Sequence, residues 1–394
     1  MSKKLNSSLK KIEKVFEKMY HKGISVSGDR MSERTVKTYT DMMKSLVRDV
    51  YEEFGVENVW EIKDEHVNQI IQRRIDSYHD GNTKEAYNLK TLLAAMKSFN
   101  LGVVETNIFK EKFEIGDPDE VRDILKEQNV IRKSRASTVL RSTPKECLSV
   151  LENIKNRGYD TETREIAYHV GKIGLETGGR ISAILRLRAG DISVDSEKGT
   201  ITFTRDKGGL TRTVQVSKET AEYLQKLKTG KKEDQFIFSS KRADGTFKSV
   251  KEVRKEVSKI FADAGKHLTR KELVKLKDKD GNYKMVEVEK KFSSHCFRKA
   301  FALERTNYYY NKFSSKSAID RFVSQKVKEN PKIKEKLDTV RERINRTRKT
   351  PRDLTREEYA IFFTSVDLGH FRNDVITAFY TTFKEVQDYY SKKI

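Results

Sequence analysis

The spacing of apolar residues is the feature that most limits what this chain can fold into. Along most of the 394 residues, apolar side chains recur three or four positions apart, which is the period of an amphipathic helix. Between residues 192 and 216 the period changes to two, which predicts short antiparallel strands, and a further hairpin is expected around 280–282. The pattern therefore predicts a mainly α protein with a small antiparallel β-sheet, in an α+β fold.

The length of the chain exceeds what one compact core usually occupies, so two domains are expected. Residues 1–28 are basic and polar, and we interpret them as an N-terminal arm with a short amphipathic helix. Residues 29–134 have the pattern of a helical bundle followed by a linker. A second domain is expected over 135–394, with its small sheet near the start and a basic helical insertion at about 304–360.

Capping residues predict where several helices begin and end. Ser32 is a plausible N-cap, and Gly55 supplies a stop after the first helix of the bundle. Another helix of the bundle is expected to end before Gly102. At the start of the second domain, Thr143 and Glu146 have the spacing of a capping box.

The charge balance points to a polyanionic partner, since 81 Lys and Arg stand against 59 Asp and Glu and give a net charge of +22. Two cysteines cannot form a disulfide framework or a four-ligand zinc site, and they suit a reducing cytosol. No apolar run approaches the ~20 residues of a membrane span, and the N-terminus lacks a signal peptide. We therefore expect a cytoplasmic protein that binds nucleic acid and has no membrane partner. Because no phosphate-binding glycine loop or His/Cys cluster occurs, no cofactor and no metal are expected.

Two segments offer cations beside turns. Arg180 follows two glycines in TGGRIS, at a predicted helix start where a guanidinium can grip a phosphate beside free backbone amides. A surface arginine after a turn is the alternative, and for this segment alone the simpler one. Lys207 lies at the predicted hairpin turn in RDKGGL, where a lysine can deliver a proton as well as a charge, although most turn lysines are merely solvated.

Two further segments combine proton transfer with charge. His295 and Arg298 are three positions apart on one face of a predicted helix in SSHCFRKA. His370 follows a glycine in DLGHF, and Tyr380 lies ten residues later, where its hydroxyl could act as a nucleophile toward phosphate. The alternatives are an ordinary helical histidine and a core tyrosine on an amphipathic helix.

In their order and local sequence, these segments together resemble the tyrosine recombinase family, which includes phage integrases and Xer-type recombinases. The family pattern has an Arg in a TGxR box, a Lys in a β-hairpin turn, an HxxR box, an LGH box and a nucleophilic Tyr nine or ten residues later. The chain supplies Arg180, Lys207, His295 with Arg298, His370 and Tyr380 in that order. The resemblance covers roughly residues 29–394 and implies the two-domain architecture of that family, with a core-binding domain and a catalytic domain.

The resemblance implies site-specific cutting and rejoining of double-stranded DNA without metal or ATP. Tyr380 would form a 3′-phosphotyrosine, Arg180 and Arg298 would bind the phosphate, and Lys207 would protonate the leaving 5′-oxygen. His295 would assist proton transfer from the tyrosine. His370 would hydrogen-bond the phosphate. Expected partners are recombination sites in DNA, a homotetramer in a synaptic complex that passes through a Holliday junction, and accessory DNA-bending or directionality proteins. The enzyme would be cytoplasmic, and nucleoid-associated when bound to DNA. It would serve integration or excision of a mobile element or Xer-like resolution.

Two departures from the family pattern affect this interpretation. Ala183 stands where the family usually has an acidic residue three positions after the first arginine. The interval between Arg298 and His370 is long, and within it residues 311–356 hold 8 Lys and 7 Arg against 6 acidic residues. This insertion could contact DNA or a neighbouring subunit, or be a solvated helical pair. A type IB topoisomerase that relaxes DNA and a recombinase relative that has lost catalysis are the alternative functions.

Overall fold

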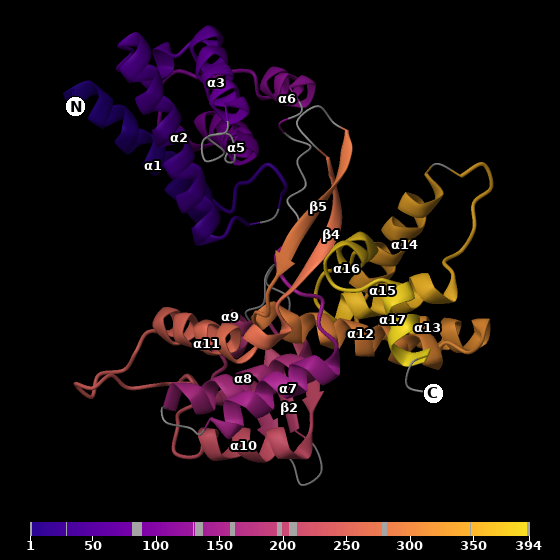
Figure 1. Ribbon diagram of the computed structural model, residues 1–394. Helices are drawn as coiled ribbons and strands as arrows, with labels where there is room; N and C mark the ends of the chain where they lie inside the picture. Colours follow the sequence, from indigo (N-terminus) through magenta and orange to yellow (C-terminus); the bar gives the residue numbers. More distant parts are fainter. Residues whose placement is uncertain are drawn as a thin grey trace. The chain divides into compact units, whose positions relative to one another are not determined.

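The computed structural model describes residues 2–28, 30–80, 89–128, 130, 137–157, 162–194, 199–204, 211–277, 282–346 and 348–391. The chain divides into two compact units: unit 1 is Met1–Ala136 with Val274–Val286, and unit 2 is Ser137–Leu273 with Glu287–Ile394. Most of the described residues are helical, and they also form one three-stranded and one two-stranded sheet (Figure 1). The mainly helical fold with small antiparallel sheets is therefore confirmed.

Unit 1 is built from amphipathic helices around one apolar core. Its described helices are α1 (Lys3–Lys22), α2 (Glu33–Phe54), η1 (Val59–Glu61), α3 (Asp64–His79), α5 (Leu89–Thr106) and α6 (Pro118–Glu127). The side chain of Ser32 caps α2, and Gly55 ends it in the left-handed conformation, as the sequence predicts. Helix α1 lies in the N-terminal arm, and its apolar face, which includes Leu5, Ile12 and Phe16, is fully buried in the core of unit 1.

Gly102 and the expected linker differ from the sequence prediction. Gly102 lies inside α5 instead of ending it. A Cβ atom at this position would come within 2.5 Å of Met19 Sδ and Val15 Cγ1, so the glycine allows α5 to approach α1 closely. The region expected to be a linker contains α6, which buries Val121 and Leu125 against the core of unit 1.

Unit 2 surrounds a central helix, α12, which packs against α7, α8, α15 and α17. Its described helices are α7 (Pro144–Asn156), α8 (Glu162–Thr177), α9 (Ile181–Ile184), η2 (Ala189–Asp191), α10 (Lys218–Lys228), α11 (Val250–Ala264), η3 (Lys266–Leu268), α12 (Ser294–Lys312), α13 (Lys316–Glu329), α14 (Lys332–Asn345), α15 (Arg356–Asp367), α16 (Asn373–Phe379) and α17 (Phe383–Ser391). Thr143 and Glu146 form the predicted capping box at the start of α7. None of the helices described in either unit is long and apolar enough to cross a membrane.

The small sheet of unit 2 has the order β1 (Ile192–Val194), β2 (Gly199–Phe203), β3 (Arg212–Val216), and its neighbouring strands are antiparallel. Ile201 of β2 pairs with Ile192 on one side and Val214 on the other, and its side chain is buried. Strands β4 (Arg270–Lys277) and β5 (Tyr283–Lys290) form the second sheet. The turn that carries Lys207 and most of the turn at 280–282 lie outside the described residues.

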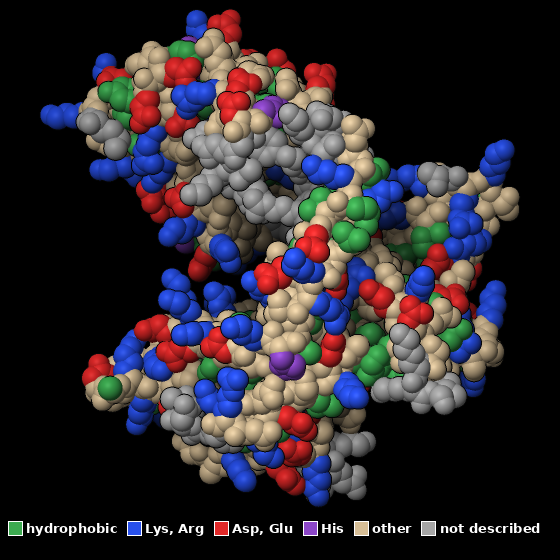
Figure 2. Space-filling model, viewed as in Figure 1, with side chains coloured by type: hydrophobic (Ala, Val, Ile, Leu, Met, Phe, Trp, Pro, Cys, Tyr) green, Lys and Arg blue, Asp and Glu red, His purple; other side chains and the backbone are tan. Residues whose placement is uncertain are grey.

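The insertion between Arg298 and His370 is a folded part of unit 2. Helices α13 and α14 pack with the end of α12 and with α15 around an apolar cluster that includes Phe313, Phe322 and Leu337. Its charged side chains lie outside this cluster, and Figure 2 shows Lys and Arg interspersed with acidic side chains on the face in view. The apolar positions of the two helices thus explain how they pack, whereas their excess of Lys and Arg lies on the surface.

Candidate active site

The TGGR segment forms a tight turn that presents Arg180. Helix α8 ends at Thr177, and the backbone of Gly178 has a φ of 62°, in the left-handed region that favours glycine. A Cβ atom at Gly178 would also lie 2.5 Å from Cδ1 of Phe301, so no other residue fits the turn without movement. Gly179 N–H donates to Thr177 Oγ1 at 3.1 Å, and Arg180 then becomes the N-cap of α9.

Arg298 is the buried centre of the site. It lies on the second turn of α12, and only 1% of its surface is exposed. Its Nε donates to the hydroxyl of Tyr380 at 3.0 Å, and its two terminal nitrogens donate to the carbonyl groups of Gly178 and Leu368. Since a buried charge needs hydrogen-bond partners, these contacts hold three segments of the chain around one guanidinium.

His370 is presented by a turn in which two residues have positive φ angles. Gly369 has a φ of 69°, and Phe371 has a φ of 55°. Ser365 stabilises this turn, because its carbonyl accepts from His370 N–H at 2.8 Å and its hydroxyl oxygen accepts from Arg372 N–H at 2.6 Å. The positive φ of this turn therefore explains the glycine before the histidine, and the turn directs the imidazole toward the other site residues.

One imidazole nitrogen joins the four central residues of the site. Nε2 of His370 lies 3.0 Å from the Tyr380 hydroxyl, 3.1 Å from Arg298 NH2 and 3.5 Å from Arg180 NH2. A guanidinium can only donate hydrogen bonds, so the contacts assign an acceptor role to this nitrogen. The phenol can then donate to His370 while it accepts from Arg298. This arrangement places a proton acceptor and the Arg298 guanidinium beside one hydroxyl, and it places the Arg180 guanidinium beside the proton acceptor.

Tyr380 lies immediately after α16, and α17 begins three residues later. The tyrosine is 9% exposed and packs near Ile376, as the core alternative predicted for the ring. Its hydroxyl nevertheless points to the polar cluster, and the Arg298 guanidinium lies 5.4 Å from the ring centre. The residue therefore combines an apolar ring environment with a hydroxyl held by charged and titratable partners.

His295 lies one turn before Arg298 on α12 and is exposed at the surface. Desolvation by the surrounding protein, and then the positive charges of Arg298, Lys299 and Arg180, lower the pKa of His295 below its usual value. The lowered pKa favours the neutral imidazole, which is the form that can accept a proton. Lys207, the sixth predicted site residue, lies outside the described residues.

Ala183 is buried in the apolar core of unit 2 together with Ile184. The position where the family pattern has an acidic residue therefore packs against apolar side chains. Arg180 is instead 3.5 Å from His370, and this contact connects it to the rest of the cluster.

Sequence reasoning missed Arg212 and Asp367, which hold in place the segments that carry the site residues. Arg212 on β3 donates to the carbonyl groups of Thr177 and Asp367 at 2.8 and 2.9 Å, and so joins the TGGR turn to the end of α15. The carboxylate of Asp367 accepts from Arg305 Nε at 2.7 Å and from Tyr309 on α12 at 3.0 Å. The position of Asp367 directly before the LGH segment was the available signal, whereas nothing in the sequence distinguishes Arg212 from other strand cations.

Comparison with known proteins gives a family match and a shared fold. Residues 141–314 match the model of the phage integrase family, a range that includes Arg180 and Arg298 and ends before His370. The XerH site-specific recombinase, solved in a post-cleavage complex with a palindromic difH substrate, is similar over 100% of this chain and 97% of that chain, with a TM-score of 0.54 and 13% identity. The Tn1549 transposon integrase in complex with transposon right end DNA is similar over 97% and 98%, with a TM-score of 0.46 and 15% identity. Comparison with curated proteins found no match.

Proposed function

We propose that this chain is a tyrosine recombinase that breaks and rejoins double-stranded DNA through a covalent bond between Tyr380 and a DNA phosphate. The observation that carries the assignment of Tyr380 is its hydroxyl, which is hydrogen-bonded to both Arg298 and His370. A phenol beside a proton acceptor and fixed cations has what a nucleophile needs in order to attack a phosphodiester. The reaction needs no energy from a nucleotide, because the new phosphodiester with tyrosine conserves the energy of the broken bond.

In the cleavage step, the Tyr380 oxygen forms a bond to phosphorus while the bond from phosphorus to the 5′-oxygen breaks. The products are a 3′-phosphotyrosine and a free 5′-hydroxyl, so one proton leaves the phenol and one must reach the 5′-oxygen. The resemblance assigns the first transfer to His295, yet His370 Nε2 is the acceptor 3.0 Å from the phenol before DNA binds. We therefore propose His370 as the first proton acceptor, with His295 as an assisting base and Lys207 as the general acid.

Arg180 and Arg298 would stabilise the phosphate as its negative charge grows. Their terminal nitrogens lie 3.5 and 3.1 Å from the same imidazole nitrogen, so both can face one phosphate group bound there. Two preorganised cations in a largely buried site should lower the barrier by several kcal/mol. The carbonyl contacts of Arg298 keep its guanidinium in place, so little reorganisation is needed when the phosphate enters.

We further propose that cleavage occurs at paired recombination sites within a homotetramer and proceeds through a Holliday junction, with accessory DNA-bending or directionality proteins. The biological role would be integration or excision of a mobile element, or Xer-like resolution, in the cytoplasm. Binding should depend mainly on phosphate contacts, since the chain carries a net charge of +22. Its affinity for DNA should therefore fall steeply as salt is added.

The test is covalent capture of DNA from a library. The protein is incubated with duplex oligonucleotides that contain a randomised core and a nick near the centre, so that cleavage releases a short fragment and traps the adduct. DNA that stays attached in sodium dodecyl sulfate is sequenced, and the linked residue is identified by peptide mass spectrometry. The wild-type adduct should map to Tyr380, while Tyr380→Phe should bind the selected DNA and form none. An equal adduct yield from that variant, or no adduct from the wild type, would overturn the proposal.

The same DNA separates recombination from the topoisomerase alternative. Two plasmid copies of the selected sequence should yield exchanged products, whereas a supercoiled plasmid without that sequence should keep its supercoils. Relaxation of the plasmid that lacks the sequence would favour a type IB topoisomerase activity. DNA binding without any covalent product would favour a relative that has lost catalysis.

A further inference from the structure

We infer that Arg141 is a positioning residue that holds the Tyr380 turn in place. The inference rests on the proposed role of Tyr380 as the nucleophile, and it concerns how that tyrosine is held. Arg141 lies at the start of unit 2, and 239 positions separate it from Tyr380. Neither its sequence neighbours nor the site motifs mark it as a functional residue.

The first set of contacts is with the end of α16. Arg141 NH2 donates to the carbonyl groups of Thr377 and Ala378 at 3.2 and 3.0 Å. The last carbonyl groups of a helix lack partners within the helix, and a cation there is also favoured by the helix dipole. Arg141 therefore fixes the helix end that leads directly into Tyr380.

The second contact is with the start of α17, on the other side of the tyrosine. Arg141 NH1 forms an ion pair with Oε1 of Glu385 at 2.6 Å. The other carboxylate oxygen of Glu385 accepts from Thr382 N–H at 2.7 Å and so caps the first turn of α17. One guanidinium thus joins the elements before and after Tyr380, which leaves the intervening turn little freedom to shift.

The backbone around Arg141 is itself held firmly. The preceding residues pair with Lys291, which directly follows β5, and Leu140 N–H donates to the Lys291 carbonyl at 3.0 Å. The amino group of Lys299 on α12 donates to the carbonyl of Val139 at 2.9 Å, and burial lowers the pKa of Lys299 to about 8. The segment that carries Arg141 is therefore fixed to the same helix, α12, that carries Arg298. Arg298 and, through Arg141, Tyr380 are therefore both positioned by α12.

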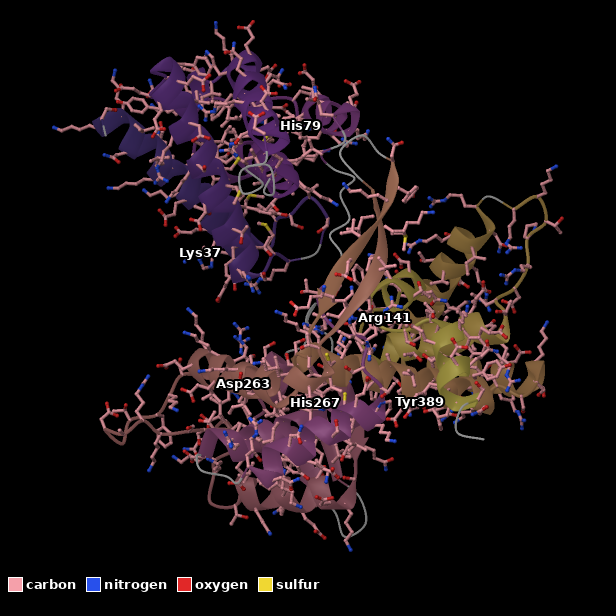
Figure 3. All side chains as sticks on the ribbon, in the orientation of Figure 1. Lys37, His79, Arg141, Asp263, His267 and Tyr389 are labelled. Atoms are coloured by element: carbon pink, nitrogen blue, oxygen red, sulfur yellow. The ribbon has the colours of Figure 1, made fainter. Side chains whose placement is uncertain are left out.

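Arg141 and Tyr380 line one cavity of about 300 Å³ together with Glu385 and Tyr389. Figure 3 labels Arg141 and Tyr389, and the latter lies on α17. The Arg141 side chain is 34% exposed, and an ion pair with that exposure adds little to overall stability. Loss of the side chain should therefore affect the placement of the tyrosine much more than the stability of unit 2.

The geometry also explains why an arginine is needed. Its planar fork directs NH1 to one helix and NH2 to the other, whereas a lysine ammonium is a compact point charge. Arg141→Lys keeps the charge and can retain the contact with Glu385 or with the α16 carbonyls, but it cannot reproduce the fork. The lysine variant should therefore be intermediate between the wild type and Arg141→Ala.

The test measures the rate of adduct formation at saturating concentrations of the nicked duplex selected by covalent capture. Arg141→Ala should form the Tyr380 adduct about ten- to a hundred-fold more slowly, since small misplacements of a reacting group have effects of this order. The dissociation constant for the same duplex and the thermal midpoint should change little, and Arg141→Lys should recover part of the rate. Arg242→Ala is the matched control, because it also removes an exposed arginine with an ion pair, to Glu252, and should keep the wild-type rate.

A double-mutant comparison tests the route through α17. Arg141→Ala combined with Glu385→Gln should be no slower than Arg141→Ala alone, because both changes break the same contact. If Arg141→Ala fails to fold, Arg141→Lys and Glu385→Gln carry the test by their rates. A wild-type rate in the Arg141 variants, an equal loss in Arg242→Ala, or a loss confined to DNA affinity would overturn the inference. Each of these outcomes leaves a wild-type adduct at Tyr380, whereas failure of the proposed function would remove that adduct.

Discussion

Replacing Gly178 with alanine should destabilise unit 2 and disturb Arg298 together. The residue has a φ of 62°, which L-residues with a side chain adopt at a cost of about 1–2 kcal/mol. Its added methyl group would lie 2.5 Å from Phe301 Cδ1 and 2.7 Å from Leu368 Cδ2, and overpacking of this kind costs about 1–3 kcal/mol. The free energy of unfolding should therefore fall by about 2–5 kcal/mol, the sum of the strain and the overpacking.

Gly174, one turn earlier in α8, is a matched control. Its φ is not in the left-handed region, and a Cβ there would meet its nearest atom, Phe297 Cβ, at 3.4 Å, an ordinary contact. Because glycine inside a helix is less favourable than alanine, Gly174→Ala should leave stability unchanged or raise it by up to about 1 kcal/mol. Gly178→Ala should thus lower the free energy of unfolding, whereas Gly174→Ala should not.

Urea unfolding measures both variants. Trp60, the single tryptophan, lies in unit 1, so its fluorescence reports on that unit while circular dichroism reports on the helices of both. Gly178→Ala should shift the dichroism transition to lower urea, and adduct formation should also fall because the Gly178 carbonyl accepts from Arg298. A Gly178→Ala protein within about 0.5 kcal/mol of the wild type would refute the reasoning from backbone angle and crowding.

Three further predictions concern buried and half-buried polar groups. Desolvation lowers the pKa of His169 to about 4, so the neutral imidazole contributes to stability above about pH 6.5, and this contribution is lost as the pH falls through about 4. His169→Phe can keep the stack on Tyr223 and should flatten the dependence of stability on pH, as measured by urea titrations. Burial raises the pKa of Cys147 and Cys296, so iodoacetamide should label both slowly in native protein and rapidly in urea; fast native labelling would contradict their burial. Asp367→Asn should lower the free energy of unfolding by about 1–3 kcal/mol, because two donors lose a charged acceptor, and an unchanged urea midpoint would exclude this support role.

The insertion shows where sequence reasoning about charge stops. Its excess of Lys and Arg left open DNA contact, subunit contact or a solvated helical pair. The structure adds that Phe313, Phe322 and Leu337 pack its helices against α12 and α15. Arg343 on α14 also lies 3.4 Å from Asp374 on α16, the helix that precedes Tyr380. A run of charged residues identifies an exposed surface, but the apolar residues between them decide which helices that segment packs against.

Helix ends, strand periods and the order of the site motifs could be predicted from the sequence, because local rules act over a few residues. The Ser32 cap, the Thr143 capping box and the glycine turn before Arg180 each depend on hydrogen bonds or φ angles within one turn. The same rules failed at Gly102, which lies within a helix. The glycine is needed there because α1, from a distant part of the chain, packs closely against it.

The tertiary structure alone decided which of these local features meet. Arg298 is buried because α12 lies at the centre of unit 2, where the carbonyl groups of Gly178 and Leu368 converge on it. Arg141 reaches Thr377 and Glu385 across 236 and 244 positions, and no local pattern encodes such contacts. The sequence by itself determined the chemistry available to the chain through its residue types and their order. Packing of the apolar helix faces determined the distances between these residues, because burying these faces brings together helices that are far apart in the chain.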